Sequence, residues 1–142
     1  MSMTDSVRLE YEIDGDNFTS AGEASVKVKK SLRQMGFEPE IIRKVSVAMY
    51  EGEINMVIHA QGGKATVDVF DDRIVIVLAD RGPGIPDIDL AMQEGYSTAR
   101  ENIRTLGFGA GMGLPNMKKY TDSMEIDTRI GEGTTITMRV SL

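Results

Sequence analysis

The sequence predicts an α+β fold, a two-layer α/β sandwich in which one mixed, mostly antiparallel sheet carries its helices on a single face. Three observations lead to this class. Segments in which apolar and polar residues alternate, as in half-buried strands, occur near both ends of the chain. Tight turns separate neighbouring strand segments, which favours antiparallel pairing. Two long segments with helical spacing follow the first strand, and they can pack together on one face of the sheet.

Length and composition indicate one soluble globular domain, 1–142. Domains most often contain about 100–150 residues, and this chain has 142, of which 41% are hydrophobic and 27% charged. A formal net charge of −6 disfavours direct binding to nucleic acid or to an anionic membrane. The sequence contains no signal peptide and no apolar run near the ~20 residues that cross a bilayer. We therefore expect a cytoplasmic protein without a nucleic-acid or membrane partner.

Cysteine and histidine usage narrows the possible chemistry. The chain has no cysteine, which excludes disulfides, thiolate nucleophiles and cysteine-bound metals. The single histidine, His59, leaves no histidine cluster for zinc, and we interpret it as a structural side chain near a helix end.

The first half of the chain predicts one strand and two helices. Apolar residues alternate over 7–13, which indicates a strand. A helix is expected over 18–35, where the following Gly36 suits a C-terminal cap. A second helix is expected to begin at Pro39, a residue suited to a first helical turn, and to end near residue 61.

The second half predicts four strands and two short helices. The segment 73–80 is apolar on both faces, so it should be a central strand of the sheet. The segment 95–113 lacks a convincing period and is the longest irregular stretch. The remaining elements are a strand over 65–69, helices over 88–93 and 114–120, and a hairpin with strands over 124–128 and 136–140 and a turn at 131–133.

Two polar residues interrupt the apolar face of the second predicted helix. Glu51 and Asn55 are four residues apart, so they lie one turn above each other on one face. Burying a carboxylate without a partner is costly. The pair therefore either reaches solvent or caps a neighbouring strand at the edge of this face, or it serves chemistry. In the second interpretation, a carboxylate for acid–base catalysis stands beside an amide oxygen that can bind a hard cation such as Mg²⁺.

Glycines concentrate in the second half, where seven of the 15 lie between Gly82 and Gly113. Gly82 and Gly84 follow Asp80 at the end of the predicted central strand. There they permit close backbone approach to a ligand, and the carboxylate can accept a hydrogen bond from an exocyclic amine; a tight turn with a solvated aspartate is the alternative. Glycine also recurs at every second position over 107–113, directly before a predicted helix. That arrangement can offer N–H groups to phosphates or form a flexible loop.

These pieces, in this order, resemble the ATP-binding motifs of the GHKL superfamily, which includes the ATPase domains of gyrase, histidine kinases and mismatch-repair proteins. The similarity covers 45–140, about two thirds of the chain, and implies a sandwich of the GHKL ATPase type. Four motifs carry it: an N box, Glu51-x-x-x-Asn55; a first glycine box, Asp80-x-Gly82-x-Gly84; a second, Gly109-x-Gly111-x-Gly113; and a final pair, Gly133-Thr134.

Within this superfamily the short chain resembles the bacterial anti-sigma factor and switch-protein serine/threonine kinases. The stretches 82–88, 95–98 and 109–111 are similar to the stressosome-type switch kinases. The stretch 55–60, in contrast, is similar to the anti-sigma kinases. One departure is Glu53, since small or apolar residues are more usual between the two N-box residues.

The resemblance implies a role for each motif residue. Asp80 would bind the adenine amino group with support from Thr134, directly or through water. Asn55 would bind Mg²⁺, and Glu51 would orient or deprotonate the attacking hydroxyl. The remaining implied contacts to ATP come from glycines and from two arginines of the expected ATP lid, 95–108: Gly82 and Gly84 at the adenine, Gly109, Gly111 and Gly113 at the phosphates, and Arg100 and Arg104 at the γ-phosphate. The two arginines are equally consistent with solvated lid charges.

The implied function is a kinase that uses ATP and Mg²⁺ to phosphorylate a serine or threonine of a small anti-anti-sigma-type antagonist protein. The alternative is a nucleotide-gated binding module that sequesters a sigma factor or activates a phosphatase with little turnover. The presence of both Glu51 and Asn55 favours turnover. A homodimer is a further expectation, because members of this group often dimerise.

Overall fold

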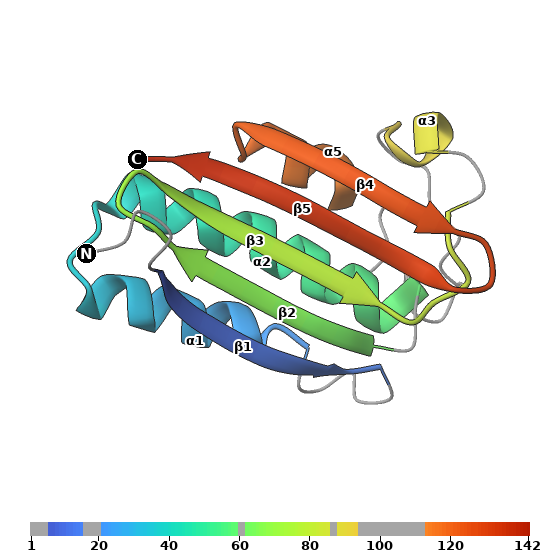
Figure 1. Ribbon diagram of the computed structural model, residues 1–142, viewed down its shortest axis with the longest axis horizontal. Helices are drawn as coiled ribbons and strands as arrows, with labels where there is room; N and C mark the ends of the chain where they lie inside the picture. The colour runs from blue at the N-terminus through green and yellow to red at the C-terminus, as the bar shows by residue number, and fades with distance from the viewer. Residues whose placement is uncertain (1–5, 16–20, 60–61, 86–87, 94–112) are drawn as a thin grey trace.

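A five-stranded sheet forms one layer of the molecule and helices form the other (Figure 1). The computed structural model describes residues 6–15, 21–59, 62–85, 88–93 and 113–142. The sheet has the order β1-β2-β3-β5-β4. Its strands are β1 (Val7–Asp14), β2 (Gly62–Val69), β3 (Arg73–Asp80), β4 (Ser123–Arg129) and β5 (Gly133–Ser141).

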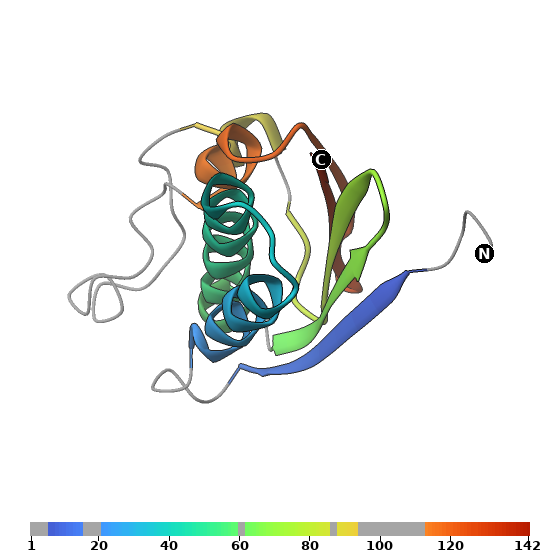
Figure 2. The ribbon, with the colours of Figure 1, turned by 90° about the vertical axis from the view of Figure 1, so that its left-hand side faces the viewer.

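The helices of the second layer gather on one face of this sheet. Figure 2 shows α1, α2 and α5 on the same side of the strands, as the sequence predicted. The described helices are α1 (Glu23–Gln34), α2 (Pro39–His59), α3 (Ile88–Ala91) and α5 (Gly113–Lys119). Helix α2 lies between α1 and α5 and also contacts the sheet. In the part of the chain that the structure describes, no helix has the length and apolarity needed to cross a membrane.

The predicted α+β class is confirmed, and so is the central place of β3 in the sheet. The pairing differs in one respect, because all four neighbouring pairs of the described strands are antiparallel rather than mixed. The reason is the position of β5. Strands β3 and β4 run in the same direction, but β5 lies between them and is antiparallel to both.

Strand β2 begins earlier than the sequence predicted. Gly62 and Gly63, which precede the strand predicted over 65–69, are the first residues of β2. Gly63 pairs with Ile13 of β1 and with Asp80 of β3. A Cβ on Gly63 would collide with the Ala79 carbonyl oxygen and lie 2.8 Å from the Asp80 Cα, so only glycine lets β2 and β3 approach this closely. The pair of glycines therefore extends the sheet up to the end of β3.

Apolar side chains from both layers form one core. The helices contribute Val28, Leu32, Val45 and Met49, all fully buried. The sheet contributes alternate residues of its strands, which is the pattern expected when one face is covered. Fully buried members from the sheet are Ala65, Val67, Ile74, Ile76, Met138 and Val140.

Helix α1 begins later than predicted, at Glu23 instead of residue 18. The preceding Gly22 has a φ of +99°, a left-handed conformation that ends the helix on its N-terminal side. Glu53 of α2 then supplies the cap from outside the helix. Glu53 is 2% exposed, and its carboxylate accepts hydrogen bonds from the backbone N–H groups of Gly22, Ala24 and Ser25 at 2.9–3.1 Å. The partly positive start of α1 thereby stabilises a buried negative charge.

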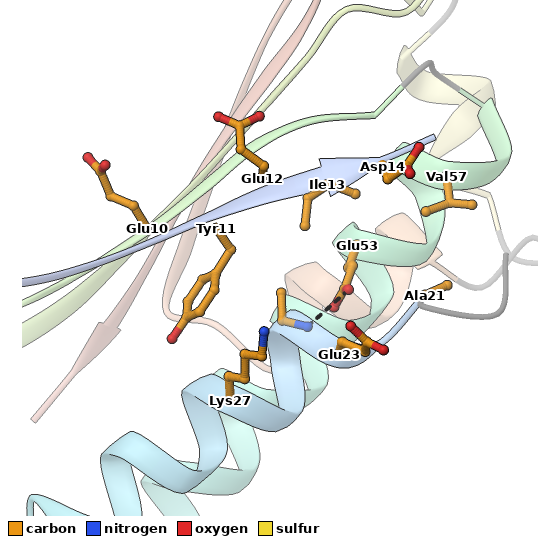
Figure 3. A pocket seen from close by; sticks show the side chains of 11 residues that line it. Glu10, Tyr11, Glu12, Ile13, Asp14, Ala21, Glu23, Lys27, Glu53 and Val57 are labelled. Atoms are coloured by element: carbon orange, nitrogen blue, oxygen red, sulfur yellow. Dashed lines mark hydrogen bonds between the residues drawn. The ribbon is translucent and has the colours of Figure 1, made fainter. Parts of the chain in front are cut away.

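This cap borders a pocket that residues of β1, α1 and α2 line (Figure 3). The pocket has a volume of about 450 Å³, and Tyr11, Lys27 and Val57 are among its lining residues. In Figure 3 Glu53 points to the start of α1 rather than toward open solvent. Glu53, the residue that departs from the N-box pattern, therefore has a structural role at the start of α1.

Replacement of Glu53 by alanine should lower the free energy of unfolding by about 2–4 kcal/mol, because three buried N–H groups lose a charged acceptor. Urea denaturation measures this difference. Glu40→Ala, at an exposed glutamate on the same helix, is the matched control and should change stability by less than about 0.5 kcal/mol. Equal stability of the two variants would show that the cap contributes nothing.

Candidate functional site

Asp80 ends β3 with one carboxylate oxygen firmly placed. Its Oδ1 accepts hydrogen bonds from the backbone N–H of Gly82, at 2.9 Å, and from that of Thr134, at 3.0 Å. The first donor belongs to the loop after β3 and the second to β5. Gly133 makes this approach possible, because a Cβ there would collide with the backbone carbonyl oxygen of Asp80. Since both hydrogen bonds go to Oδ1, the half-buried carboxylate can present Oδ2 to a ligand.

The loop after β3 is joined to the β4–β5 hairpin by further hydrogen bonds. The Ile85 N–H donates to Thr128 Oγ1 at 2.8 Å, and the Thr128 and Thr134 hydroxyl oxygens are 2.8 Å apart. The Gly131 N–H donates to the Pro83 carbonyl oxygen at 3.0 Å. Hydrogen bonds therefore connect Asp80 and the first glycine box to β4 and β5.

Gly84 is the glycine of this loop whose conformation requires a glycine. It has a φ of +85°, and a Cβ there would lie 2.8 Å from the Arg129 carbonyl oxygen. Gly82, in contrast, acts through its N–H and is buried. The two glycines of the first box thus serve different purposes: one fixes Asp80, and the other lets the loop pass close to the hairpin.

Glu51 and Asn55 lie on the face of α2 that contacts α5, and both are half-buried. Asn116 of α5 donates from Nδ2 to Glu51 Oε1 at 3.3 Å. The Asn55 Nδ2 is 4.0 Å from the Met117 sulfur, so its amide nitrogen points into α5. The amide oxygen can then serve as a ligand for a cation.

Gly113 brings the end of the second glycine box to Asn55. A Cβ on Gly113 would lie 2.6 Å from Asn55 Nδ2 and 2.8 Å from Oδ1. The start of α5 and the N-box amide are therefore in close contact. Gly109, Gly111, Arg100, Arg104 and the predicted lid 95–108 lie outside the described residues, and their roles stay predictions.

Gly52 connects the two halves of the site. It follows Glu51, and a Cβ there would collide with the Leu78 side chain and lie 3.4 Å from the Met117 methyl carbon. Helix α2 thus runs close to β3, two residues before Asp80, and close to α5. Figure 1 shows that α2 and β3 end on the same side of the molecule. The N-box pair and Asp80 consequently border one region.

The donor set suits magnesium better than a transition metal. Among the described residues, no three histidine, cysteine or acidic side chains come together around one point. Mg²⁺ usually takes only one or two protein ligands and completes its shell with phosphate oxygens and water. An amide oxygen from Asn55, with substrate phosphates beside it, fits that pattern.

Residues 4–140 match the protein family described as histidine kinase-like ATPase domain. This match covers nearly the whole chain. The chain belongs to the histidine kinase-like ATPase family. The sandwich with an N box on its central helix and Asp80 at the end of β3 is consistent with this membership.

Relatives of this histidine kinase-like ATPase domain include a bacterial serine/threonine-protein kinase and bacterial anti-sigma F factors. The serine/threonine-protein kinase RsbT of Bacillus subtilis is 32% identical over 73% of this chain and 75% of its own length. The anti-sigma F factor of Caldanaerobacter subterraneus is 35% identical, with 70% and 69% covered. That of Pasteuria penetrans is 30% identical, with 92% and 88% covered. The predicted resemblance to anti-sigma factors and switch-protein kinases, and the assignment to a kinase class, are confirmed by these relatives.

A solved structure supports the fold. The mycobacterial sensor histidine kinase MprB superposes with a TM-score of 0.53 at 16% identity, covering 95% of this chain and 97% of the other. At that identity the likeness concerns the fold alone, and it agrees with the predicted GHKL type.

Two residues of the site were missed by the sequence analysis. Asn116 holds Glu51, and Thr128 joins the first glycine box to Thr134. A signal for Thr128 existed in the predicted hairpin, because pairing the two strands around the turn 131–133 places Thr128 opposite Thr134. Asn116 had no comparable signal, since helix packing sets its distance to Glu51.

Proposed function

We propose that this histidine kinase-like ATPase domain is an ATP-dependent protein serine/threonine kinase that phosphorylates a small antagonist protein in the cytoplasm. The observation that carries the proposal is the N-box pair. Glu51 and Asn55 lie half-buried on one face of α2, each oriented by a residue of α5. A pure binding module needs the amide for the nucleotide but has no use for an oriented carboxylate. The names of the relatives support the same assignment.

The base of the nucleotide would lie against Asp80. With Oδ1 held by two backbone N–H groups, Oδ2 would accept a hydrogen bond from the adenine amino group. Thr134, 4% exposed and beside Asp80, would contact the base edge from β5. Gly82 and Gly84 would give the base access to the backbone of the loop.

The phosphates would lie between Asn55 and the start of α5. The Asn55 amide oxygen would bind Mg²⁺, and the N-terminal N–H groups of α5, together with Gly109 and Gly111, would face the phosphate oxygens. When bound, Mg²⁺ neutralises the charge that builds up on the transferred group. Arg100 and Arg104 are proposed to assist at the γ-phosphate.

Glu51 would act on the protein substrate. The serine or threonine oxygen forms a bond to the γ-phosphorus as the bond between that phosphorus and the bridging oxygen breaks, and ADP leaves. The hydroxyl proton passes to the Glu51 carboxylate, whose orientation is kept by Asn116. Positioning and charge stabilisation supply most of the rate in such transfers.

Phosphoryl transfer can be tested with the purified chain, radiolabelled ATP, Mg²⁺ and a lysate of the organism from which the sequence comes. We expect the label on a serine or threonine of one small protein, identified by mass spectrometry. Tight ATP binding without transfer to any protein would contradict the kinase and favour a module that sequesters a sigma factor, in line with the relatives named anti-sigma F factor.

Gly113→Ala should weaken binding of ATP with Mg²⁺ about tenfold without lowering the melting temperature. Gly113 is not among the glycines with positive φ, so alanine fits the backbone of α5. Its methyl group would instead displace the Asn55 amide, which lies within 3.0 Å. Calorimetry measures the affinity, and Lys118→Ala, at an exposed position of α5, is the control. If Gly113→Ala binds ATP with Mg²⁺ as tightly as the wild type, Asn55 does not bind the metal.

A further inference from the structure

Strand β1 forms one edge of the sheet. Among the described residues it pairs with β2 alone. In an antiparallel pair every second residue directs its N–H and C=O groups away from the neighbouring strand. The outer edge of β1 therefore offers a row of backbone donors and acceptors, which is the template on which an extended peptide can add as a further strand.

The pocket of Figure 3 lies along this edge. Five consecutive residues of β1, 10–14, line it. Side chains of a strand alternate between its two faces, so a cavity that borders all five residues lies along the backbone edge. Its volume of about 450 Å³ is within the range of ligand pockets, ~300–1,000 Å³. Glu23 and Lys27 of the α1 wall carry opposite charges, so together they add no net charge to the pocket.

The two faces of β1 differ in their chemistry. Figure 3 shows Tyr11 pointing from the strand toward α1, whereas Glu10 and Glu12 point to the opposite side of the strand. On the α1 side, apolar groups of Ala24 and Val57 line the pocket together with Tyr11. A strand that added to this edge would therefore meet an apolar wall with one set of its side chains and carboxylates with the other.

The charges of β1 are matched by cations and carboxylates of β2 on one flank. Lys64 lies opposite Glu12 in the register, and its Nζ is 3.4 Å from the Glu10 carboxylate. Arg8 donates two hydrogen bonds to the Asp68 carboxylate, at 2.7 and 2.9 Å, and also lies 3.8 Å from Glu10. On the other flank no described strand lies beside the two glutamates. Opposite charges directly across a strand pair stabilise it, so this flank favours a strand whose outward side chains are basic.

A second copy of this chain does not have the complementary charges. Two β1 strands related by a two-fold axis would run antiparallel with their equivalent faces on the same side. In the registers that pair most of the strand, Glu10 would lie opposite Glu10 or opposite Glu12. Like charges directly opposite each other destabilise a strand pair. The charges of β1 therefore favour a different protein as the occupant of this edge.

We propose that the outer edge of β1 binds an extended segment of a partner protein, which adds to the sheet as a further strand and in which basic and apolar residues alternate. The apolar side chains of the segment enter the pocket beside Tyr11, and its basic side chains lie opposite Glu10 and Glu12. Main-chain hydrogen bonds supply the affinity, and the alternate side chains supply the specificity. The site uses none of the residues proposed to bind ATP, so binding of the segment does not require the nucleotide.

Synthetic peptides test this docking site. The probe is a fluorescein-labelled peptide of the same length as β1 in which lysine and valine alternate, and the reference peptide carries the same lysines and valines in separate blocks. Fluorescence anisotropy at physiological salt should show the probe binding at least about tenfold more tightly than the reference. Two further probes carry N-methyl groups on all lysines or on all valines. Because one of these two sets of N–H groups faces β1, one methylated probe should bind at least about tenfold more weakly and the other about as tightly as the probe itself.

Variants of the protein locate the site. Replacing both Glu10 and Glu12 by lysine should weaken binding of the probe about tenfold, because the basic side chains then meet like charges. The matched control replaces Glu125 and Asp127 by lysine. These are exposed carboxylates of β4, at the opposite edge of the sheet, and their loss should change the affinity less than about twofold. Melting curves show that both variants are folded.

Amide hydrogen exchange of β1 gives a readout that does not depend on charge. The N–H groups on the free edge should exchange rapidly in the protein alone and slowly when the probe is bound. The proposal is overturned if the probe does not bind, if the block peptide binds equally well, or if the two methylated probes bind alike. Protection of β1 without any peptide, rising with protein concentration, would place a second copy on this edge and would equally overturn it.

Discussion

Replacing Glu51 by alanine should reduce phosphoryl transfer to the protein substrate about 10²–10⁴-fold while ATP binding is largely kept. This is the range that general-base catalysis contributes. Glu51 is half-buried, and its hydrogen bond within the described residues is the one that its Oε1 accepts from Asn116, so its removal leaves no buried charge unpaired there and the chain should still fold. Radiolabel transfer to the protein substrate measures the rate, calorimetry measures the affinity for ATP, and a melting curve shows whether the variant is folded.

Asn55→Ala provides the contrast to Glu51→Ala. It should lose the part of ATP binding that depends on Mg²⁺, because the cation loses its protein oxygen. Glu40→Ala, on the exposed side of the same helix, should transfer phosphate at the wild-type rate. A Glu51→Ala variant that is as fast as the wild type would show that the base lies elsewhere.

Asp80→Asn should weaken ATP binding about 10- to 100-fold. Both oxygens of the carboxylate accept hydrogen bonds. Oδ1 accepts from the N–H groups of Gly82 and Thr134, and Oδ2 is proposed to accept from the adenine amino group. An asparagine side chain has one oxygen that accepts and an NH₂ group that only donates. If its oxygen keeps the two backbone N–H groups, its NH₂ group faces the adenine amino group; if it turns over, its NH₂ group faces the backbone donors.

Calorimetry with ATP tests this second prediction. Asp127→Asn, at an exposed position of β4 close by in the sheet, carries the same chemical change and should leave the affinity unaltered. Because the turned-over amide would also strain the end of β3, the melting temperature of Asp80→Asn without nucleotide should fall slightly. Equal ATP affinity in Asp80→Asn and the wild type would remove Asp80 from the adenine site.

The elements with a clear period could be predicted from the sequence. Alternation placed β1, and the doubly apolar segment identified β3 as central, because residue spacing alone decides which faces are buried. The start of α1 could not be found this way. It depends on Gly22 and on the carboxylate of Glu53, a residue 31 positions away from Gly22. Local propensity contains no information about such a distant cap.

The resemblance in motif order singled out Glu51, Asn55 and Asp80, and the structure places the ends of α2 and β3 on the same side of the molecule. What remained hidden depends on packing between elements. The Asn55 amide is positioned by Gly113 and Met117, which a pattern within α2 cannot show. Glu53 lies between the two N-box residues in sequence and departs from the family pattern. Its carboxylate faces α1, where it accepts hydrogen bonds from backbone N–H groups at the start of that helix.

Neighbouring residues within about one turn of α2 thus face three different elements of the fold. Glu51 and Asn55 face α5, Gly52 faces β3, and Glu53 faces α1. Each residue added to a helix rotates everything after it by about 100°. A single insertion or deletion ahead of this turn would therefore misdirect the chemistry, the packing and the cap all at once. Contacts on three sides therefore fix the rotation of α2 about its own axis.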